Sequence, residues 1–254
     1  EKAVIVAGVE QAIDYLAGMK LSEAEVNYLK GLKGVDGEQL FEPAYVDYLA
    51  AMDWGLNVKG MKEGEVALPH EPVLQIEGPL IQVQLVETAL LNMVNFQTLV
   101  ATKSAIICEA ADGDDVLEFG LRRAQGPDGG VSASRAAYVG GCVATSNVLA
   151  GLQFGIPVKG THAHSWVMSY DDEMEAFEAY ASAMPNNTLL LVDTYDTVEG
   201  VKKAIEVGVR LRKQGQELLG VRLDSGDLCA LSIAARKLLD EAGFEKARIV
   251  ASND

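Results

Sequence analysis

Basic residues and cysteines are scarce in this sequence. Its 254 residues include 21 Lys and Arg against 37 Asp and Glu, so the formal net charge is −16. We expect no binding to nucleic acid, because the chain has no basic field that could release the counterions of a phosphate backbone. An anionic substrate would need a local basic pocket that acts against this acidic background.

The three cysteines are odd in number, far apart in the sequence and set among apolar neighbours: Cys108, Cys142 and Cys229. This pattern predicts buried free thiols in a reducing compartment, and hence a cytoplasmic location, not a disulfide framework or a zinc site.

Long hydrophobic runs are also missing. The longest uncharged run, residues 136–158, is interrupted by glycines, Asn147 and Pro157, and predicts a buried helix followed by a strand, with no membrane span. The first residues show no basic leader before an apolar core, so no signal peptide is expected. Because strand-like runs lie at both ends, we expect the chain to be a piece of a longer protein.

Residues 1–111 predict an incomplete α+β domain. Helical periodicity occurs at residues 10–16 and 43–52, and Ser22 with Glu25 has the spacing of a capping box. Residues 54–85 then alternate between apolar and polar side chains and are rich in Gly and Pro, which predicts short antiparallel strands. An apolar-faced helix over residues 84–110 connects this domain to the second half.

Residues 112–254 predict an incomplete (β/α) barrel domain. Apolar strand candidates alternate with amphipathic helices and lie at residues 116–119, 156–158, 189–192, 219–223 and 249–251. Such alternation indicates right-handed crossovers and a parallel sheet. A barrel is favoured over an open doubly wound sheet, because polar motifs follow every strand and not only one switch point.

The residues that follow these strands carry the candidate chemistry. Arg122 and Arg123 can bind a carboxylate or phosphate, because guanidinium groups bind such anions in a bidentate manner. Gly160, Thr161 and Ser165 lie where a helix begins near residue 163 and predict a second anion-binding site. The two sites together indicate chemistry on a phosphorylated sugar.

Acidic side chains and histidines follow the same strands. Asp193 and Asp224 could hold sugar hydroxyls or Mg²⁺, and His162 and His164 lie two residues apart. The sequence has neither a P-loop nor a Gly-x-Gly-x-x-Gly motif, so a P-loop or dinucleotide-binding fold is not supported. A phosphosugar aldolase or isomerase remains an alternative, although the only lysine at a strand exit, Lys159, has no evident desolvating pocket. A non-catalytic remnant that binds phosphoribosyl compounds is a second alternative.

Four segments resemble, in order, the signature blocks of the nicotinate phosphoribosyltransferase family, which has the type II phosphoribosyltransferase fold. They are residues 118–130, 160–165, 192–197 and 221–228. The resemblance implies an enzyme of NAD biosynthesis, a ligase or glycosyltransferase, that joins nicotinate to phosphoribosyl pyrophosphate and couples the reaction to ATP hydrolysis through a phosphohistidine. It also implies Mg²⁺ as cofactor and a homodimer.

The resemblance assigns roles to individual residues. It implies that His164 carries the phosphoryl group, whereas His162 falls on a variable position and is expected to have no catalytic role. Asp193 is the candidate for orienting His164. Arg122 and Arg222 would meet the nicotinate carboxylate or the pyrophosphate, and Phe119 would stack on the pyridine ring. Asp193 and Asp224 would hold ribose hydroxyls or Mg²⁺, and Ser225 and Gly226 belong to the same substrate-binding block.

The chain departs from the family pattern at both ends. It lacks the N-terminal segment whose tyrosine stacks on the base, and the glycine-rich phosphate loop expected after residue 254. The resemblance therefore leaves open whether these 254 residues are active alone.

Overall fold

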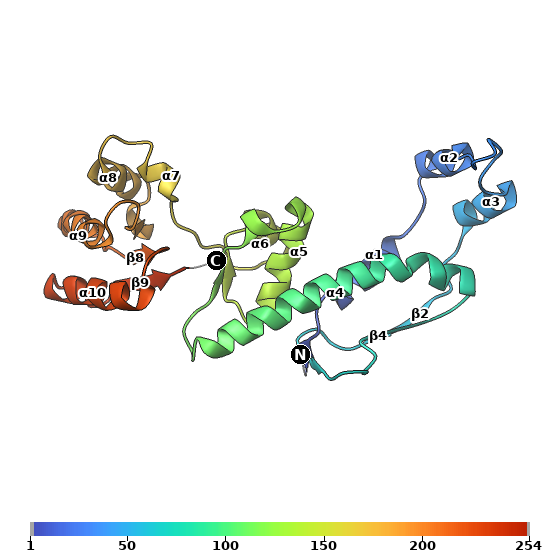
Figure 1. The fold of residues 1–254 in the computed structure, drawn as a ribbon, viewed down its shortest axis with the longest axis horizontal. Helices are drawn as coiled ribbons and strands as arrows, with labels where there is room; N and C mark the ends of the chain where they lie inside the picture. Colours follow the sequence, from blue (N-terminus) through green and yellow to red (C-terminus); the bar gives the residue numbers. More distant parts are fainter. Residues whose placement is uncertain (1–2, 253–254) are drawn as a thin grey trace. The chain divides into compact units, whose positions relative to one another are not determined.

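The computed structural model describes residues 3–252 and divides into two compact units between Lys159 and Gly160 (Figure 1). Asn253 and Asp254, which belong to the last predicted strand exit, lie outside the described residues. The predicted domain boundary after residue 111 stays a prediction, and the first parallel strands belong to the same compact unit as the N-terminal helices.

The first unit begins with helices and short antiparallel strands. Its helices are α1 (Val9–Gly18), α2 (Glu23–Gly31) and α3 (Pro43–Ala51). Strand β1 (Val4–Ile5) pairs with β3 (Val66–Ala67), and β2 (Asn57–Gly60) pairs with β4 (Leu74–Glu77), both antiparallel, as predicted for the strands within residues 54–85. The capping box is also present, since the Glu25 amide donates to Ser22 Oγ and the Ser22 amide to Glu25 Oε2.

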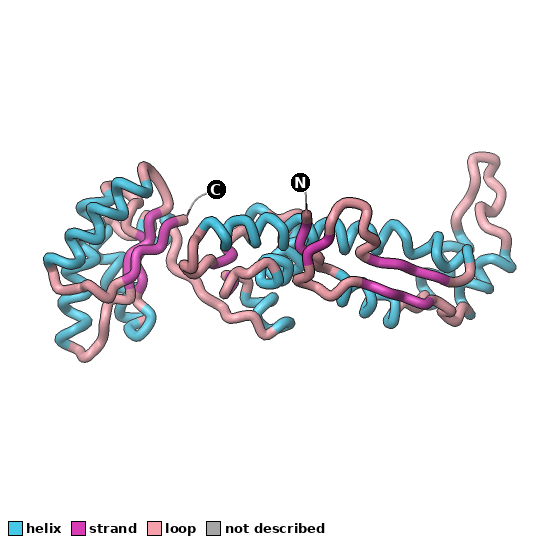
Figure 2. The backbone as a smooth tube through the Cα atoms, turned by 90° about the horizontal axis from the view of Figure 1, so that it is seen from below, coloured by secondary structure: helices cyan, strands magenta, loops and turns pink. Residues whose placement is uncertain are grey.

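A long helix, α4 (Leu80–Ala110), organises this unit. Its buried Val86 and Leu90 pack with Leu16 of α1 and with Val58 and Ile76 of the β2–β4 pair, which lies along the helix in Figure 2. Helix α4 begins four residues before the start that the apolar pattern predicts. Within residues 3–252, no helix has both the length and the apolar character needed to cross a membrane, α4 included.

The first unit ends with a small parallel arrangement. It consists of β5 (Leu117–Glu118), the 3-10 helix η1 (Leu121–Arg123), α5 (Gly126–Val139), β6 (Ala144–Thr145) and α6 (Val148–Phe154). Strands β5 and β6 are parallel, and Val158 forms a single parallel bridge with Thr145. The predicted strand at 156–158 is therefore only one bridge, and the prediction omitted β6 because two residues carry too little periodicity to detect.

The second unit is a parallel sheet covered by helices. It contains α7 (His164–Val167), α8 (Glu173–Ala183), the 3-10 helix η2 (Pro185–Asn187), β7 (Leu189–Leu191), α9 (Thr197–Lys213), β8 (Gly220–Leu223), α10 (Leu228–Glu241) and β9 (Arg248–Ala251). The strand order is β7-β8-β9, all parallel, as the alternation of strands and helices predicts.

The core of the second unit lies between this sheet and helices α8, α9 and α10 (Figure 1). Phe177, Leu190, Leu223, Leu239 and Phe244 are almost completely buried there. Burial of side chains of this size contributes about 1.5–3 kcal/mol each. The sheet is thus a rigid base for the loops that follow its strands.

The cysteines are free thiols, but the prediction that all are buried is wrong. Cys142 is buried, Cys108 is partly buried and Cys229 is exposed. Cys229 is the second residue of α10 and faces solvent in the first turn, whereas the apolar residues around it in the sequence belong to the buried face of the helix. Burial raises the pKa of the Cys142 thiol to about 12, with smaller contributions from Cys108.

Helix α9 approaches β7 so closely that only glycine fits at residue 200. A Cβ atom there would lie 2.0 Å from the carbonyl oxygen of Val192. We expect Gly200→Ala to lower the free energy of unfolding by about 1–3 kcal/mol, as overpacked core positions do. Urea titration followed by the fluorescence of Trp166 measures this.

The control is Gly18→Ala at the end of α1, where a Cβ atom would contact nothing within 4 Å. Equal unfolding midpoints for the two variants would contradict this account of the contact between α9 and β7.

Candidate active site

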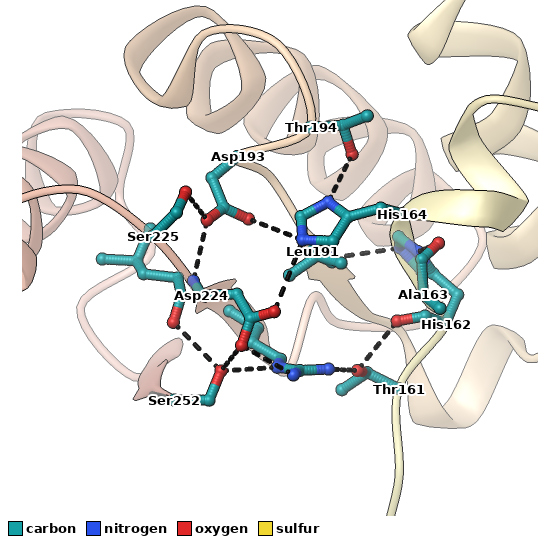
Figure 3. Close-up of polar contacts among 12 residues, drawn as sticks. Thr161, His162, Ala163, His164, Leu191, Asp193, Thr194, Asp224, Ser225 and Ser252 are labelled. Atoms are coloured by element: carbon teal, nitrogen blue, oxygen red, sulfur yellow. Dashed lines mark hydrogen bonds and ion pairs between the residues drawn. The ribbon is translucent and has the colours of Figure 1, made fainter. Parts of the chain in front are cut away.

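Polar side chains meet where the three strands of the second unit end. Asp193 and Thr194 follow β7, Asp224 follows β8 and Ser252 follows β9. The carboxyl ends of parallel strands lie at one edge of a sheet, which is where α/β folds place their ligands. Figure 3 shows these side chains directed toward His164 and toward one another.

His164 is the first residue of α7 and is held from both ring nitrogens. Its Nδ1 lies 3.1 Å from Thr194 Oγ1. Its Nε2 lies 3.4 Å from Asp224 Oδ2 and 4.0 Å from Asp193 Oδ1, and its side chain is 37% exposed. The imidazole is therefore fixed in orientation and still reachable by a solute.

Asp193 is buried, and only one of its two carboxylate oxygens accepts hydrogen bonds within the described part of the chain. Its side chain is 1% exposed. Its Oδ2 accepts hydrogen bonds from Ser225 Oγ at 2.6 Å and from the Asp224 amide at 2.8 Å. Its Oδ1 has no hydrogen-bond partner among the described residues. A buried acceptor without a donor costs about 1–3 kcal/mol, so this oxygen is suited to receive a donor or a cation from a ligand.

Asp224 is held by Arg222 and Ser252. Its Oδ1 accepts from Arg222 Nη2 at 2.9 Å and from Ser252 Oγ. Burial opposes ionisation, but the hydrogen bond from Ser252, the charge and hydrogen bond of Arg222 and the contact with His164 outweigh it, so the pKa of Asp224 lies below its usual 3.8. The carboxylate beside His164 is therefore charged at neutral pH.

Comparison with known proteins identifies the family. The model for the nicotinate phosphoribosyltransferase N-terminal domain matches residues 1–95, and the model for the nicotinate phosphoribosyltransferase family matches residues 115–247. The chain belongs to the nicotinate phosphoribosyltransferase family. Nicotinate phosphoribosyltransferase from Bacillus subtilis is 46% identical over 98% of the chain, and the enzyme from Dictyostelium discoideum is 42% identical over 98%.

Solved structures agree with this membership. The crystal structure of human nicotinic acid phosphoribosyltransferase matches all of the chain with a TM-score of 0.90 at 34% identity, and the match covers 61% of the human protein. The nicotinate-nucleotide pyrophosphorylase of Pyrococcus furiosus matches all of the chain with a TM-score of 0.74 at 26% identity, and the match covers 56% of the Pyrococcus protein. The predicted α/β class with the type II phosphoribosyltransferase fold is thus confirmed. The chain spans 50% of the length of the Bacillus and Dictyostelium relatives.

Several residues that the family resemblance predicts lie together in the second unit. Thr161, Asp193, Arg222, Asp224 and Ser225 join His164 in one hydrogen-bonded cluster. Gly160 and Ser165 are exposed beside it in the chain, and Gly226 has a φ of 76°, which a side chain rarely adopts, in the turn before α10. Asp224, not Asp193, is the carboxylate nearer to His164.

Arg222 has partners within the cluster. Its Nε donates to Ser252 Oγ at 2.9 Å and its Nη1 to Thr161 Oγ1 at 3.0 Å, in addition to the bond to Asp224. These contacts join the loop before α7 to the ends of β8 and β9. Its contact with nicotinate or pyrophosphate stays a prediction, while its role in placing Asp224 is structural.

Sequence reasoning missed Thr194 and Ser252, because a hydroxyl residue after a strand is too common to be a signal by itself. A third omission is Glu118 in the first unit. Its carboxylate accepts hydrogen bonds from Ser134 Oγ, Thr145 Oγ1 and the Gly120 amide, and so fixes the turn after β5. The sequence signal that could have identified Glu118 is a carboxylate at the end of an apolar strand.

Three predicted residues lie in the first unit. Arg122 and Arg123 are exposed in η1, and Phe119 is partly buried just before it. The hydrogen bonds of Glu118 hold the turn that presents them. Their predicted roles in binding nicotinate and phosphate stay predictions.

The cluster also bears on the expected Mg²⁺. Within residues 3–252, no three or more His, Cys, Asp or Glu side chains gather as a metal site. Mg²⁺, however, is commonly held by one or two carboxylates together with substrate phosphates. Asp193 and Asp224 fit that smaller donor set, and the unpartnered Oδ1 of Asp193 is the atom that supports it.

Removal of the Arg222 charge provides a test of this electrostatic arrangement. We expect Arg222→Met to raise the pKa of Asp224, since the charge and hydrogen bond that favour the carboxylate are lost. A depressed carboxyl pKa contributes stability that is present above pH 3.8 and is lost as the pH falls through the folded-state pKa, so the variant should have less of this stability at neutral pH and lose less of it on acidification. Carbon-13 NMR titration of the aspartate carboxyls measures the pKa directly.

The matched control is Arg122→Met, which removes an exposed guanidinium from the other unit. An Asp224 pKa that is unchanged in Arg222→Met, or changed equally by Arg122→Met, would disprove the arrangement.

Proposed function

We propose that the protein containing this chain is a nicotinate phosphoribosyltransferase that forms nicotinate mononucleotide and pyrophosphate from nicotinate and phosphoribosyl pyrophosphate. ATP hydrolysis is coupled to this reaction through phosphorylation of His164. The observation that carries the proposal is the position of His164, whose Nδ1 contacts Thr194 while its Nε2 faces Asp193 and Asp224. The names of the relatives support the choice of substrates.

The surroundings of His164 favour one tautomer. Two carboxylate oxygens face Nε2, and Asp224 Oδ2 is the closer, so the ring proton is stable on Nε2. The lone pair is then on Nδ1, where the Thr194 hydroxyl donates to it in the resting state. When that hydroxyl turns away, Nδ1 becomes the nucleophile.

Phosphorylation begins with attack of Nδ1 on the γ-phosphorus of ATP. The N–P bond forms as the bond from phosphorus to the β-γ bridging oxygen breaks, and ADP leaves. The positive charge that develops on the imidazole is stabilised by Asp224 through Nε2–H. Water later attacks the phosphohistidine, so that phosphate leaves and Nδ1 regains its lone pair.

Ribosyl transfer places different demands on the site. The pyridine nitrogen of nicotinate bonds to the anomeric carbon as the bond to pyrophosphate breaks, and positive charge develops at the ribose. Asp193 is suited to stabilise this charge or to accept a ribose hydroxyl, because its Oδ1 has no hydrogen-bond partner among the described residues. Ser225 and the Asp224 amide hold the opposite oxygen in place.

The anionic parts of the substrates need cationic and amide donors. Arg122 and Arg123 would bind the nicotinate carboxylate or a phosphate, and Phe119 would stack on the pyridine ring. Gly160, Thr161 and Ser165 would offer hydroxyl and amide donors to a second phosphate. Bound at Asp193 and Asp224, Mg²⁺ would neutralise pyrophosphate charge. We also propose that the protein is a homodimer, as the family resemblance implies, and that it is cytoplasmic, as its free thiols suggest.

Labelling with ATP tests the phosphohistidine. We expect the full-length protein incubated with γ-labelled ATP to gain a phosphate that is labile in acid and stable in base. His164→Ala should lose this label completely, because the only accepting nitrogen of the cluster is removed. The control is His70→Asn, a substitution at an exposed histidine in a turn with a φ of 70°, which should keep the label.

Label that persists in His164→Ala would reject the assignment. Calorimetric binding of phosphoribosyl pyrophosphate by a full-length protein that shows neither labelling nor turnover would instead support a non-catalytic remnant.

A further inference from the structure

His162 is the second histidine of the loop that carries His164, and it is buried. Its residue is 7% exposed, and its ring packs against Tyr180 at 4.8 Å and Phe177 at 6.0 Å between ring centroids. Both aromatic residues belong to α8. The His162 ring is thus enclosed in the core of the second unit, whereas the His164 ring is accessible to solutes.

The hydrogen bonds of His162 assign its tautomer. The Leu191 amide donates to its Nε2 at 3.1 Å, so Nε2 carries the lone pair. The proton then lies on Nδ1, 3.5 Å from the carbonyl oxygen of Ala163. Burial lowers the pKa of His162 to about 4, and the charges of Arg222 and His164 act in the same direction. The ring is therefore neutral at physiological pH and can keep accepting.

The donor to this ring belongs to the free edge of β7. The Val192 amide donates to Arg222 in β8, and successive amides of a strand point to opposite edges, so the Leu191 amide points away from β8. An unpaired amide buried at a sheet edge costs about 1–3 kcal/mol. The His162 imidazole supplies the acceptor that a neighbouring strand would otherwise provide (Figure 3).

This bond links the two segments that form the His164 site. Two residues after His162 is His164, and two residues after Leu191 is Asp193, followed by Thr194. The bond from Leu191 to His162 thus precedes the contacts of His164 with Asp193 and Thr194 by two or three residues in both segments. Loss of this bond would shift Asp193 and Thr194 relative to the His164 imidazole.

We infer that His162 is a positioning residue, whose Nε2 lone pair sets the register between the His164 loop and the end of β7. This inference rests on the proposed function of His164 for its kinetic consequence, but the bond itself can be tested without catalysis. Glutamine can replace the acceptor with its side-chain oxygen, whereas leucine fills similar space and accepts no hydrogen bond. The two substitutions therefore separate hydrogen bonding from packing.

The experiment compares His162→Leu, His162→Gln and wild type in the full-length protein. We expect His162→Leu to lower kcat and the rate of His164 phosphorylation by about tenfold or more with little change in KM, since misplaced reacting groups are costly in rate. His162→Gln should restore both rates to within about threefold of wild type. Tyr180→Phe, which keeps the ring that packs on His162, serves as the packing control and should retain the wild-type rate.

Amide hydrogen exchange at Leu191 gives a readout that is independent of activity. It should be faster in His162→Leu and close to wild type in His162→Gln. Equal exchange and equal kcat in all variants would overturn the inference, as would a glutamine variant no better than leucine. If wild type shows no phosphorylation, the proposed function fails, while the exchange data still decide whether His162 holds β7.

Discussion

The charge on Asp224 is the constraint on which the site depends. A carboxylate in this position loses hydration, and it stays ionised because Arg222 and Ser252 bind one of its oxygens. The other oxygen is thereby free to face His164 Nε2. Without this carboxylate, the His164 ring proton would have no preferred nitrogen, and the lone pair would not be held on Nδ1.

The same arrangement joins separate parts of the second unit. Arg222 bonds to Thr161 before α7 and to Ser252 after β9, so one guanidinium links the His164 loop to two strand ends. Buried polar networks of this kind are costly when one member is removed, because the remaining partners stay desolvated. Arg222, Asp224 and Ser252 therefore act together. Their main effect is to fix the position of the Asp224 carboxylate, and their net contribution to stability is secondary.

Much of the fold of the second unit, and the proximity of several site residues, could be predicted from the sequence. Strand and helix periodicity was strong enough to predict β7, β8 and β9, and the placement of polar residues after each strand indicated that Asp193, Asp224 and His164 would converge. Strand β6 could not be predicted, and the predicted strand at 156–158 is only a single bridge, since pairing with other segments decides both. Solvent exposure of Cys229 likewise depends on which face of α10 packs on the sheet.

The roles of individual side chains were harder to predict than their proximity. Arg222 was expected to meet substrate, but its hydrogen bonds to Thr161, Asp224 and Ser252 depend on distances across loops that no sequence spacing encodes. His162 was dismissed because it occupies a variable position of the motif. Its importance depends on the Leu191 amide of β7, which faces away from β8 and donates to the His162 ring, and this is visible only when the strand order is known.

We propose that carboxylates hold the proton on Nε2 of His164 and leave Nδ1 to accept a phosphoryl group. The most direct test of this claim is phosphorus-nitrogen coupling in the NMR spectrum of the full-length protein, labelled with nitrogen-15 in histidine and phosphorylated by ATP. We predict that the phosphorus couples to Nδ1 of His164. Coupling to Nε2, or a phosphate attached to any other residue, would contradict the claim.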